Sequence, residues 1–221
     1  MERPSVRSYT IRRSRITGGQ MEAKASLQEI YGIEFKQELI DIPALFPGCD
    51  KLFIEIGFGM GEATAIIAEN HPTNAYIAVD VHPPGVGKLL ARIVENELTN
   101  IKVIEEDIHV VMQHMIPDGS LDGIHLFFPD PWPKTKHYKR RIVKTGFLEL
   151  IHPKMKAGAY IHVATDWVPY ARDIQTVFKS SPLFIGGVVE KPEWRPVTKF
   201  EGQGIDKDHA VHDMLYTKVE N

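Results

Sequence analysis

The sequence predicts an α/β fold, a doubly wound and mostly parallel sheet of about seven strands with helices on both faces. Three observations predict it. From residue 51 onward, short apolar runs alternate with longer stretches of helical periodicity. A glycine-rich turn follows the first apolar run, and acidic residues follow the next two. Strands that alternate with helices pair in parallel through right-handed crossovers, which produces this architecture.

The expected elements follow one another in a regular order. The expected strands are Lys51–Ile56, Ala75–Asp80, Ile101–Glu105, Leu121–Phe128 and Gly158–Ala164, with Leu183–Val189 and Met214–Val219 as closing strands. One helix, Glu62–Asn70, ends before Pro72. A second, Pro84–Leu98, begins at a proline, which is favourable in the first helical turn. The pattern leaves the spatial order of the strands open.

Composition predicts one globular domain, because the 221 residues are 43% hydrophobic and 25% charged. No apolar run approaches the roughly 18 residues of a membrane helix, so we expect no membrane partner. Cys49 is the only cysteine, which excludes an internal disulfide and suits a reducing, cytoplasmic location. The first residues are polar and poorly periodic. We therefore expect residues 1–25 to be a basic, flexible arm and residues 26–221 to be the domain.

Positive charge is concentrated in two stretches, although the net charge is −3. Residues 1–15 contain five arginines and one acid, and residues 134–144 contain six basic residues and no acid. A local patch, rather than the total charge, decides whether a polyanion is attracted. The serines among the first arginines also suit an organellar transit peptide. A basic arm on a cytoplasmic protein is the interpretation we favour.

The glycine-rich turn, Glu55–Gly61, follows the first strand, and ligands of such sheets bind at the carboxyl ends of the strands. Gly57 and Gly59 let the backbone turn sharply and approach a ligand closely. A dinucleotide fingerprint requires a glycine where Glu62 stands, and an acid at a helix start opposes a bound pyrophosphate. The turn therefore favours a nucleoside without phosphates over NAD, although such turns also occur for purely structural reasons.

Acids after the next two strands strengthen the prediction of a nucleoside site. Asp80 stands 23 residues past Gly57, where a carboxylate can accept hydrogen bonds from a ribose diol. Asp107 follows the third strand and can accept from an adenine amino group. Either acid alone can equally be a helix cap. Together with the glycine turn they predict an S-adenosylmethionine pocket of the Rossmann-like methyltransferase class.

The fourth strand leads into a distinctive segment, Leu126–Pro133, with the sequence LFFPDPWP. Prolines on both sides of Asp130 fix the backbone, which predicts a carboxylate beside the cofactor's methyl group. Trp132 offers a flat face on which a base can stack. Amino-group methyltransferases often carry an Asn-Pro-Pro-aromatic motif here, so the acid argues for a different acceptor. The alternative is a proline-stiffened loop with a core tryptophan.

The basic run begins four positions after Asp130, so we expect substrate and positive charge to share one rim of the site. Phosphate contacts position a nucleic acid without reading its sequence, which is the role expected of Lys136, Lys139, Arg140 and Arg141. Asp166, at the end of the fifth strand, is a further candidate to hold a base. The ten histidines show no metal-ligand spacing, so we expect no metal.

From about residue 5 to its end, the chain resembles bacterial tRNA (guanine-N7-)-methyltransferases, which belong to class I of the S-adenosylmethionine-dependent methyltransferases. The motifs that carry the resemblance are Glu55–Gly61, Val81–Gly87, Phe127–Trp132, Lys139–Arg141, Ala164–Trp167 and Arg195–Glu201. Together they are highly specific, whereas the glycine turn alone is not. Many members have glutamate where this chain has Asp80, which shortens the reach toward the ribose.

The resemblance implies methyl transfer to N7 of a guanine in the variable loop of tRNA. It implies that Glu55, Asp80 and Asp107 bind the cofactor and that Asp130 is the active-site acid. The implied substrate contacts are Lys134, Asp166, Thr198, Lys199, Phe200 and Glu201, and the implied RNA contacts are Lys136, His137, Tyr138, Lys139, Arg140 and Arg141. Three alternatives remain: a protein or small-molecule methyltransferase, a non-catalytic RNA-binding protein, and an NAD oxidoreductase. The oligomeric state, monomer or homodimer, is left open.

Overall fold

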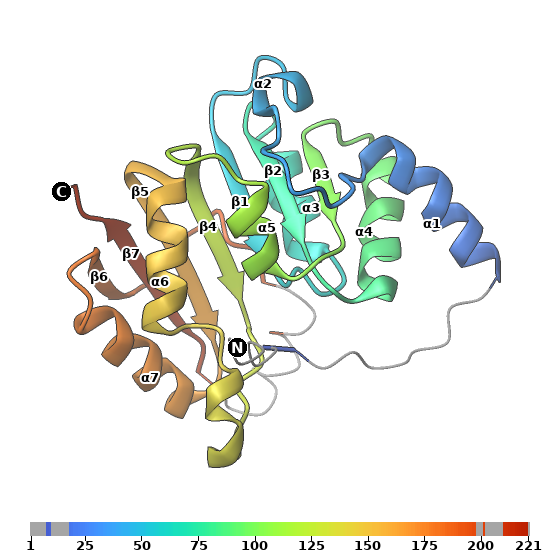
Figure 1. Cartoon of the computed structure of the whole chain (residues 1–221). Helices are drawn as coiled ribbons and strands as arrows, with labels where there is room; N and C mark the ends of the chain where they lie inside the picture. Colours follow the sequence, from blue (N-terminus) through green and yellow to red (C-terminus); the bar gives the residue numbers. More distant parts are fainter. Residues whose placement is uncertain (1–7, 10–17, 198–200, 202–209, 221) are drawn as a thin grey trace, which may run out of the picture.

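A computed structural model describes residues 8–9, 18–197, 201 and 210–220 of the chain (Figure 1). The described residues form a seven-stranded sheet with the order β3-β2-β1-β4-β5-β7-β6. Its strands are β1 (Leu52–Ile56), β2 (Ala75–Val79), β3 (Ile101–Ile104), β4 (Leu121–Phe127), β5 (Met155–Thr165), β6 (Phe184–Val189) and β7 (His212–Lys218). Neighbouring strands from β3 to β5 pair in parallel, and β7 is antiparallel to both β5 and β6.

The helices lie on both faces of this sheet (Figure 1). They are α1 (Gly18–Tyr31), α2 (Ile42–Leu45), α3 (Glu62–Asn70), α4 (Pro83–Glu95), α5 (Ile108–His114), α6 (Thr145–Ile151) and α7 (Val168–Lys179), with the 3₁₀ segments η1 (Thr135–Arg140) and η2 (His152–Lys154). One apolar cluster joins α5, α6 and α7 to one face, and another joins α3 and α4 to the opposite face. Helices packed on both faces of the sheet confirm the predicted doubly wound architecture.

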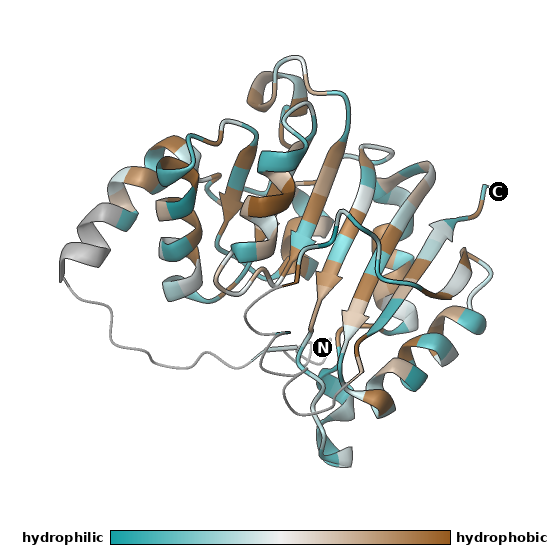
Figure 2. Ribbon diagram, turned by 180° about the vertical axis from the view of Figure 1, so that it is seen from behind, coloured by the Kyte–Doolittle hydropathy of each residue, from teal (hydrophilic) through white to brown (hydrophobic). Residues whose placement is uncertain are grey.

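Apolar periodicity explains why these segments form these elements. All residues of β1 and β2 are buried, as expected for central parallel strands covered on both faces. In α4, the buried Val86, Leu89, Leu90 and Ile93 recur at helical spacing and face the sheet. Figure 2 shows the result, with brown apolar strands in the middle and teal, hydrophilic surfaces on the outer helices.

The N-terminal part differs from the expectation in one respect. Helix α1 begins at Gly18, inside the segment for which we expected an arm. Lys24 on this helix forms an ion pair with Glu105, just after β3, and Leu27 packs against the apolar cluster that holds α4. Helix α1 therefore begins before residue 26, the expected start of the domain. Among the described residues, no helix has the length and apolar character needed to cross a membrane.

Candidate active site

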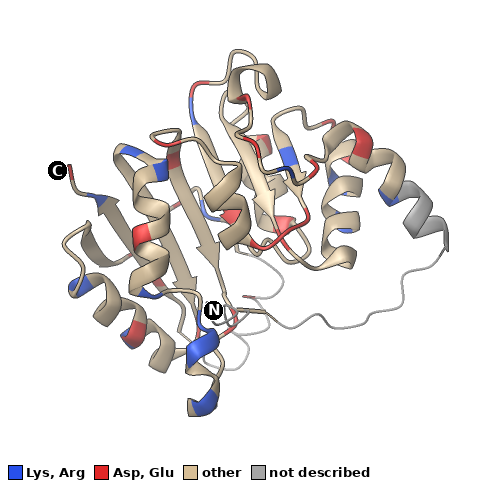
Figure 3. Cartoon of the chain, viewed as in Figure 1, with Lys and Arg blue, Asp and Glu red and all other residues tan. Residues whose placement is uncertain are grey.

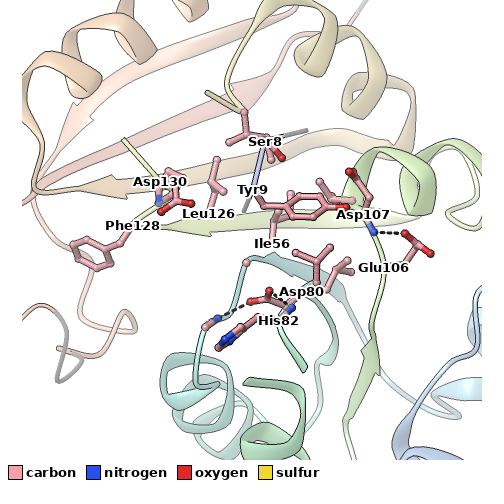
Figure 4. A pocket seen from close by; sticks show the side chains of 17 residues that line it. Ser8, Tyr9, Ile56, Asp80, His82, Glu106, Asp107, Leu126, Phe128 and Asp130 are labelled. Carbon is pink, nitrogen blue, oxygen red and sulfur yellow. Dashed lines mark hydrogen bonds between the residues drawn. The ribbon is translucent and has the colours of Figure 1, made fainter. Parts of the chain in front are cut away.

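A cavity of about 290 Å³ opens at the carboxyl ends of β1, β2, β3 and β4 (Figure 4). This position lies across the point where the strand order reverses between β1 and β4, which is where doubly wound sheets bind their ligands. The wall consists of Ser8, Tyr9, Ile56, Gly57, Gly59, Val79, Asp80, Val81, His82, Glu106, Asp107, Ile108, Leu126, Phe128, Pro129, Asp130 and Ile142. The sequence-predicted Gly57, Gly59, Asp80, Asp107 and Asp130 thus share one cavity.

The glycine turn adopts backbone angles that other residues rarely reach. Gly57 and Gly59 have φ of 70° and 58°, in the left-handed region. The Gly57 amide also donates to Val79 O at 2.8 Å, which ties the turn to the end of β2. The backbone of the turn therefore forms one side of the cavity, as the spacing of its glycines predicts.

Asp80 holds two backbone segments together at the cavity wall. Its Oδ2 accepts a hydrogen bond from the Gly59 amide at 2.9 Å, and its Oδ1 accepts one from the His82 amide at 2.9 Å. Burial raises the pKa of Asp80, and the bond from Gly59 opposes that shift. Each carboxylate oxygen can accept more than one hydrogen bond, so the side chain can also receive hydroxyl donors from a ligand.

Glu55 lies behind the glycine turn, outside the cavity wall. Its side chain is 3% exposed, and its Oε2 accepts a hydrogen bond from Thr64 Oγ1 on α3 at 2.7 Å. Burial raises the pKa of Glu55 to about 7, and the bond from Thr64 opposes that shift. The structure thus bonds Glu55 to α3, and its contact with a cofactor stays a prediction.

Asp107 caps a helix and also lines the cavity, and its contact with adenine stays a prediction. Its Oδ1 caps α5 by accepting from the His109 amide at 2.9 Å. The residue also lines the cavity beside Glu106. A helix cap and a cavity wall are therefore compatible at this position.

The segment after β4 carries Asp130 to the rim of the cavity, where it is exposed. Phe128 and Trp132 have φ of 50° and 44°, so this loop has a specific and uncommon backbone. The Trp132 Nε1 donates to Ser8 O at 3.0 Å, and the Arg140 guanidinium lies 4.9 Å from its ring. Trp132 is therefore held by the N-terminal segment and by η1, and its role in stacking on a base stays a prediction.

The basic run forms η1 and the loop before it, next to the Asp130 loop (Figure 3). Lys134, Lys136 and Lys139 are exposed, and Arg140 is half-buried against Trp132. The segment presents positive charge at the rim of the cavity, close to where a substrate would meet Asp130. A polyanion can be bound at this surface by phosphate contacts.

Arg141 departs from the expected role in RNA binding. It is 4% exposed, forms an ion pair with Asp173 on α7, and donates from Nε to Pro131 O at 2.9 Å. Its guanidinium also lies 3.7 Å from the centre of the Tyr138 ring. Arg141 therefore anchors η1 and the Asp130 loop, and this conformation does not present it to RNA. A run of like charges in sequence does not reveal which of its members is buried.

Of the expected substrate contacts, Lys134 and Asp166 lie outside the cavity wall. Thr198, Lys199 and Phe200 fall outside the described residues. Glu201 is 4% exposed and binds Arg195 through both oxygens, at 2.8 and 3.0 Å. The structure therefore places Glu201 in a buried ion cluster outside the cavity wall, and its contact with a substrate stays a prediction.

This cluster was not foreseen from the sequence. Arg195 also binds both carboxylate oxygens of Asp213 on β7, at 2.7 and 2.9 Å, and His162 Nε2 lies 2.7 Å from Asp213. The Arg195 guanidinium lies 5.8 Å from the Phe128 ring, directly behind the Asp130 loop. Ser8 and Tyr9 are likewise unforeseen members of the cavity wall, because a short polar segment gives no periodic signal of where it packs.

The cavity fits a nucleoside cofactor that carries positive charge. Its described wall contains Asp80, Glu106, Asp107 and Asp130, and neither lysine nor arginine. A pyrophosphate would find no lysine or arginine in this wall, whereas the sulfonium and ammonium groups of S-adenosylmethionine suit its carboxylates. Across the described part of the chain, no group of three or more His, Cys, Asp or Glu residues is arranged to hold a metal ion.

Comparison with known proteins agrees with this chemistry. Residues 50–214 match the family described as "Putative methyltransferase". A tRNA (guanine-N(7)-)-methyltransferase of Nitrosospira multiformis is 45% identical over 218 residues, which cover 97% of this chain and 95% of that protein. One from Neisseria meningitidis serogroup B is 43% identical, with 97% of this chain and 92% of that protein covered.

Solved structures show the same fold at low sequence identity. The 16S rRNA methyltransferase KamB matches with a TM-score of 0.58 at 15% identity, covering 83% of this chain and 95% of that one. An rRNA methylase from Streptococcus thermophilus matches with a TM-score of 0.53 at 12% identity, covering 82% and 99%. The fold, the acidic cavity and the full-length relatives agree, and the chain belongs to the tRNA (guanine-N(7)-)-methyltransferase family of S-adenosylmethionine-dependent methyltransferases.

Proposed function

We propose that this protein transfers a methyl group from S-adenosylmethionine to N7 of a guanine in the variable loop of tRNA. The observation that carries the proposal is that one loop joins the cofactor cavity to the basic surface. Asp130 lines the cavity, and η1 with its exposed lysines follows within the next residues. The relatives named above are tRNA (guanine-N(7)-)-methyltransferases, and their sequence similarity extends over almost the whole length of this chain.

The chain's own residues hold the cofactor by its nucleoside part. Asp80 faces the cavity from the end of β2, where its carboxylate can accept from the ribose hydroxyls. Asp107 faces it from the end of β3 and can accept from the adenine amino group. Gly57 and Gly59 allow the close approach of the backbone. When bound, S-adenosylmethionine supplies an activated methyl group on a sulfonium centre.

The acceptor requires no base from the protein. Guanine N7 has an in-plane lone pair and carries no proton at neutral pH. Methylation leaves positive charge on the base, so an exposed carboxylate at the cavity rim stabilises the product-like state. The position of Asp130 in the cavity wall supports this role and a second role in orienting the guanine.

The tRNA is positioned by its phosphates. Lys136, Lys139 and Arg140 on η1 are the groups we expect to contact the backbone, with His137 and Tyr138 beside them. Lys134, Asp166, Thr198, Lys199 and Phe200 remain proposed substrate contacts. A tRNA substrate and the single Cys49 both suit a cytoplasmic location.

The test is incubation with methyl-labelled S-adenosylmethionine and unmodified tRNA, followed by nucleoside analysis. We expect the label in 7-methylguanosine from the variable loop. A tRNA with 7-deazaguanine at the target should bind normally and accept no label. Labelling of the deaza substrate would show that another atom is the acceptor. Activity that survives ribonuclease treatment would indicate a protein or small-molecule substrate, and tRNA binding without transfer would indicate a non-catalytic protein.

A further inference from the structure

Two residues of the N-terminal segment lie in the wall of the cofactor cavity, far in sequence from the strands that form it. Ser8 and Tyr9 line the same cavity as Asp80, Asp107 and Asp130. In Figure 4 the Tyr9 ring lies above Ile56 and points toward Asp107. Because Asp107 is the expected partner of the adenine amino group, Tyr9 occupies the adenine end of the cavity.

A hydrogen bond attaches this segment to the Asp130 loop. The indole Nε1 of Trp132 donates to Ser8 O at 3.0 Å. The Arg140 guanidinium lies 4.9 Å from the Trp132 ring, and His137 meets this ring edge-on at 5.7 Å. Ser8 is thus bonded to a side chain that also contacts η1.

The position of Tyr9 suits contact with a base. An aromatic ring stacks on the flat face of any nucleobase. About 290 Å³ of cavity remains with Tyr9 in its wall, which is close to the lower end of the range for small-molecule sites. The ring therefore bounds the space for a nucleoside and does not fill it.

We propose that Ser8 and Tyr9 are part of the S-adenosylmethionine site. The Tyr9 ring contacts the adenine base, and the bond from Trp132 to Ser8 holds the ring there. This inference rests on the proposed function, since it assigns the cavity to that cofactor. It gives Ser8 and Tyr9 a role in cofactor binding that their distance in sequence from the strands does not predict.

Calorimetry with two ligands tests the proposal: S-adenosylhomocysteine, and methylthioadenosine, which lacks the amino-acid part. Tyr9→Ala should weaken both by the same factor, about 5- to 100-fold, the range for removing a ring that stacks on a base. Tyr9→Phe keeps the ring and should stay within about threefold of the wild type. Trp132→Phe removes the N–H that binds Ser8 and should weaken both ligands about 3- to 10-fold.

The matched control is Tyr31→Ala, which removes the same side chain from α1, outside the cavity wall. It should leave both affinities unchanged, and all variants should keep the near-ultraviolet circular dichroism of a folded protein. Unchanged affinities in Tyr9→Ala would overturn the proposal, and tighter binding would show that Tyr9 obstructs the site. A loss for S-adenosylhomocysteine alone would overturn the adenine contact. Absence of binding by the wild type would instead contradict the proposed function as well.

Discussion

Three of the four carboxylates in the cavity wall, Asp80, Asp107 and Asp130, have different surroundings. Both oxygens of Asp80 accept backbone amides, and Asp107 caps α5 with one oxygen. Asp130 is exposed at the rim, on a loop whose backbone is fixed by prolines and by two left-handed residues. The first two acids therefore build the cavity as well as line it. Of the three, only Asp130 is exposed, which suits the role proposed for it toward a substrate that arrives from solvent.

Replacing Asp130 by asparagine keeps the shape of the side chain and removes its charge. We expect methyl transfer to slow by roughly 10²- to 10³-fold, the scale for losing one preorganised electrostatic group. Substrate binding should change less than the rate, because the interaction strengthens as charge develops. Single-turnover rates measure this step, and they should be nearly independent of pH around neutrality. A rate equal to that of the wild type would show that the charge of Asp130 takes no part in methyl transfer.

Glu55 makes stability depend on pH in a direction opposite to that of most acids. Burial raises its pKa to about 7 in the folded protein, above the ordinary value of 4.5. Its contribution to stability is therefore complete below the ordinary pKa and is lost as the pH rises through about 7. Glu55→Gln cannot ionise and lacks this loss. Its free energy of unfolding, relative to that of the wild type, should therefore rise by roughly 2–3 kcal/mol as the pH increases from about 5 to 8. Urea denaturation across this range measures the difference, and a constant difference would contradict the raised pKa.

At the scale of elements, η1 separates the basic residues into two groups. Lys136 and Lys139 are exposed on it, whereas the next residue after it, Arg141, is buried against Tyr138 and pairs with Asp173. The short helix thus faces solvent on one side and is fastened to α7 on the other. Only the exposed group is available to a phosphate backbone.

This division has a measurable consequence in the salt dependence of tRNA binding. Lys136→Ala and Lys139→Ala should each reduce the slope of log affinity against log salt by about 0.7–0.9. Cofactor affinity should barely change. Arg141→Ala provides the contrast, since it should lower the melting temperature and leave the slope of the remaining folded protein unchanged. Equal slopes in all three variants and the wild type would show that η1 is only a solvated surface.

Most elements were predictable because they bury apolar residues at regular spacing. The helix Glu62–Asn70 has the predicted bounds, and the strands differ by a few residues at their ends. Helix α1 was not predicted, because its residues lack a strong apolar stripe. The acids at the strand ends were predictable from topology, since parallel strands deliver them to one edge. The burial of Arg141 and Glu201 was not predictable. Arg141 pairs with Asp173, which is distant in sequence, and Glu201 pairs with Arg195, which lies in a loop without periodicity.

At the scale of the whole molecule, a buried ion cluster fastens the segment after β6 to the sheet. Arg195 is 1% exposed and binds Glu201 and Asp213 with all of its guanidinium nitrogens. Hydrogen bonds from His162 and Arg195 outweigh burial and lower the pKa of Asp213. The cluster lies behind Phe128, so it supports the loop that carries Asp130.

Glu201→Gln should therefore act on stability before it acts on substrate binding. The substitution removes the charge from two buried hydrogen bonds to Arg195, while Asp213 still compensates the guanidinium, so we expect a loss of about 1.5–3 kcal/mol. Urea denaturation measures the loss. Glu190→Gln is the matched control, an exposed acid of the same region whose replacement should have little effect. If Glu201 instead contacts the substrate, stability should stay constant and KM for tRNA should rise.

The position of β7 affects how the protein is completed during synthesis. β7 follows β6 in the chain and yet lies between β5 and β6 in the sheet. Until the ribosome has released residues 212–218, β6 has no neighbour to pair with and β5 has an open edge. Asp213, the partner of both Arg195 and His162, arrives on the same strand. Strands β6 and β7 and the buried ion cluster must therefore wait for the synthesis of β7, whereas the other five strands can pair without it. A nascent chain that stalls before β7 would expose the edge of β5, which is prone to aggregation.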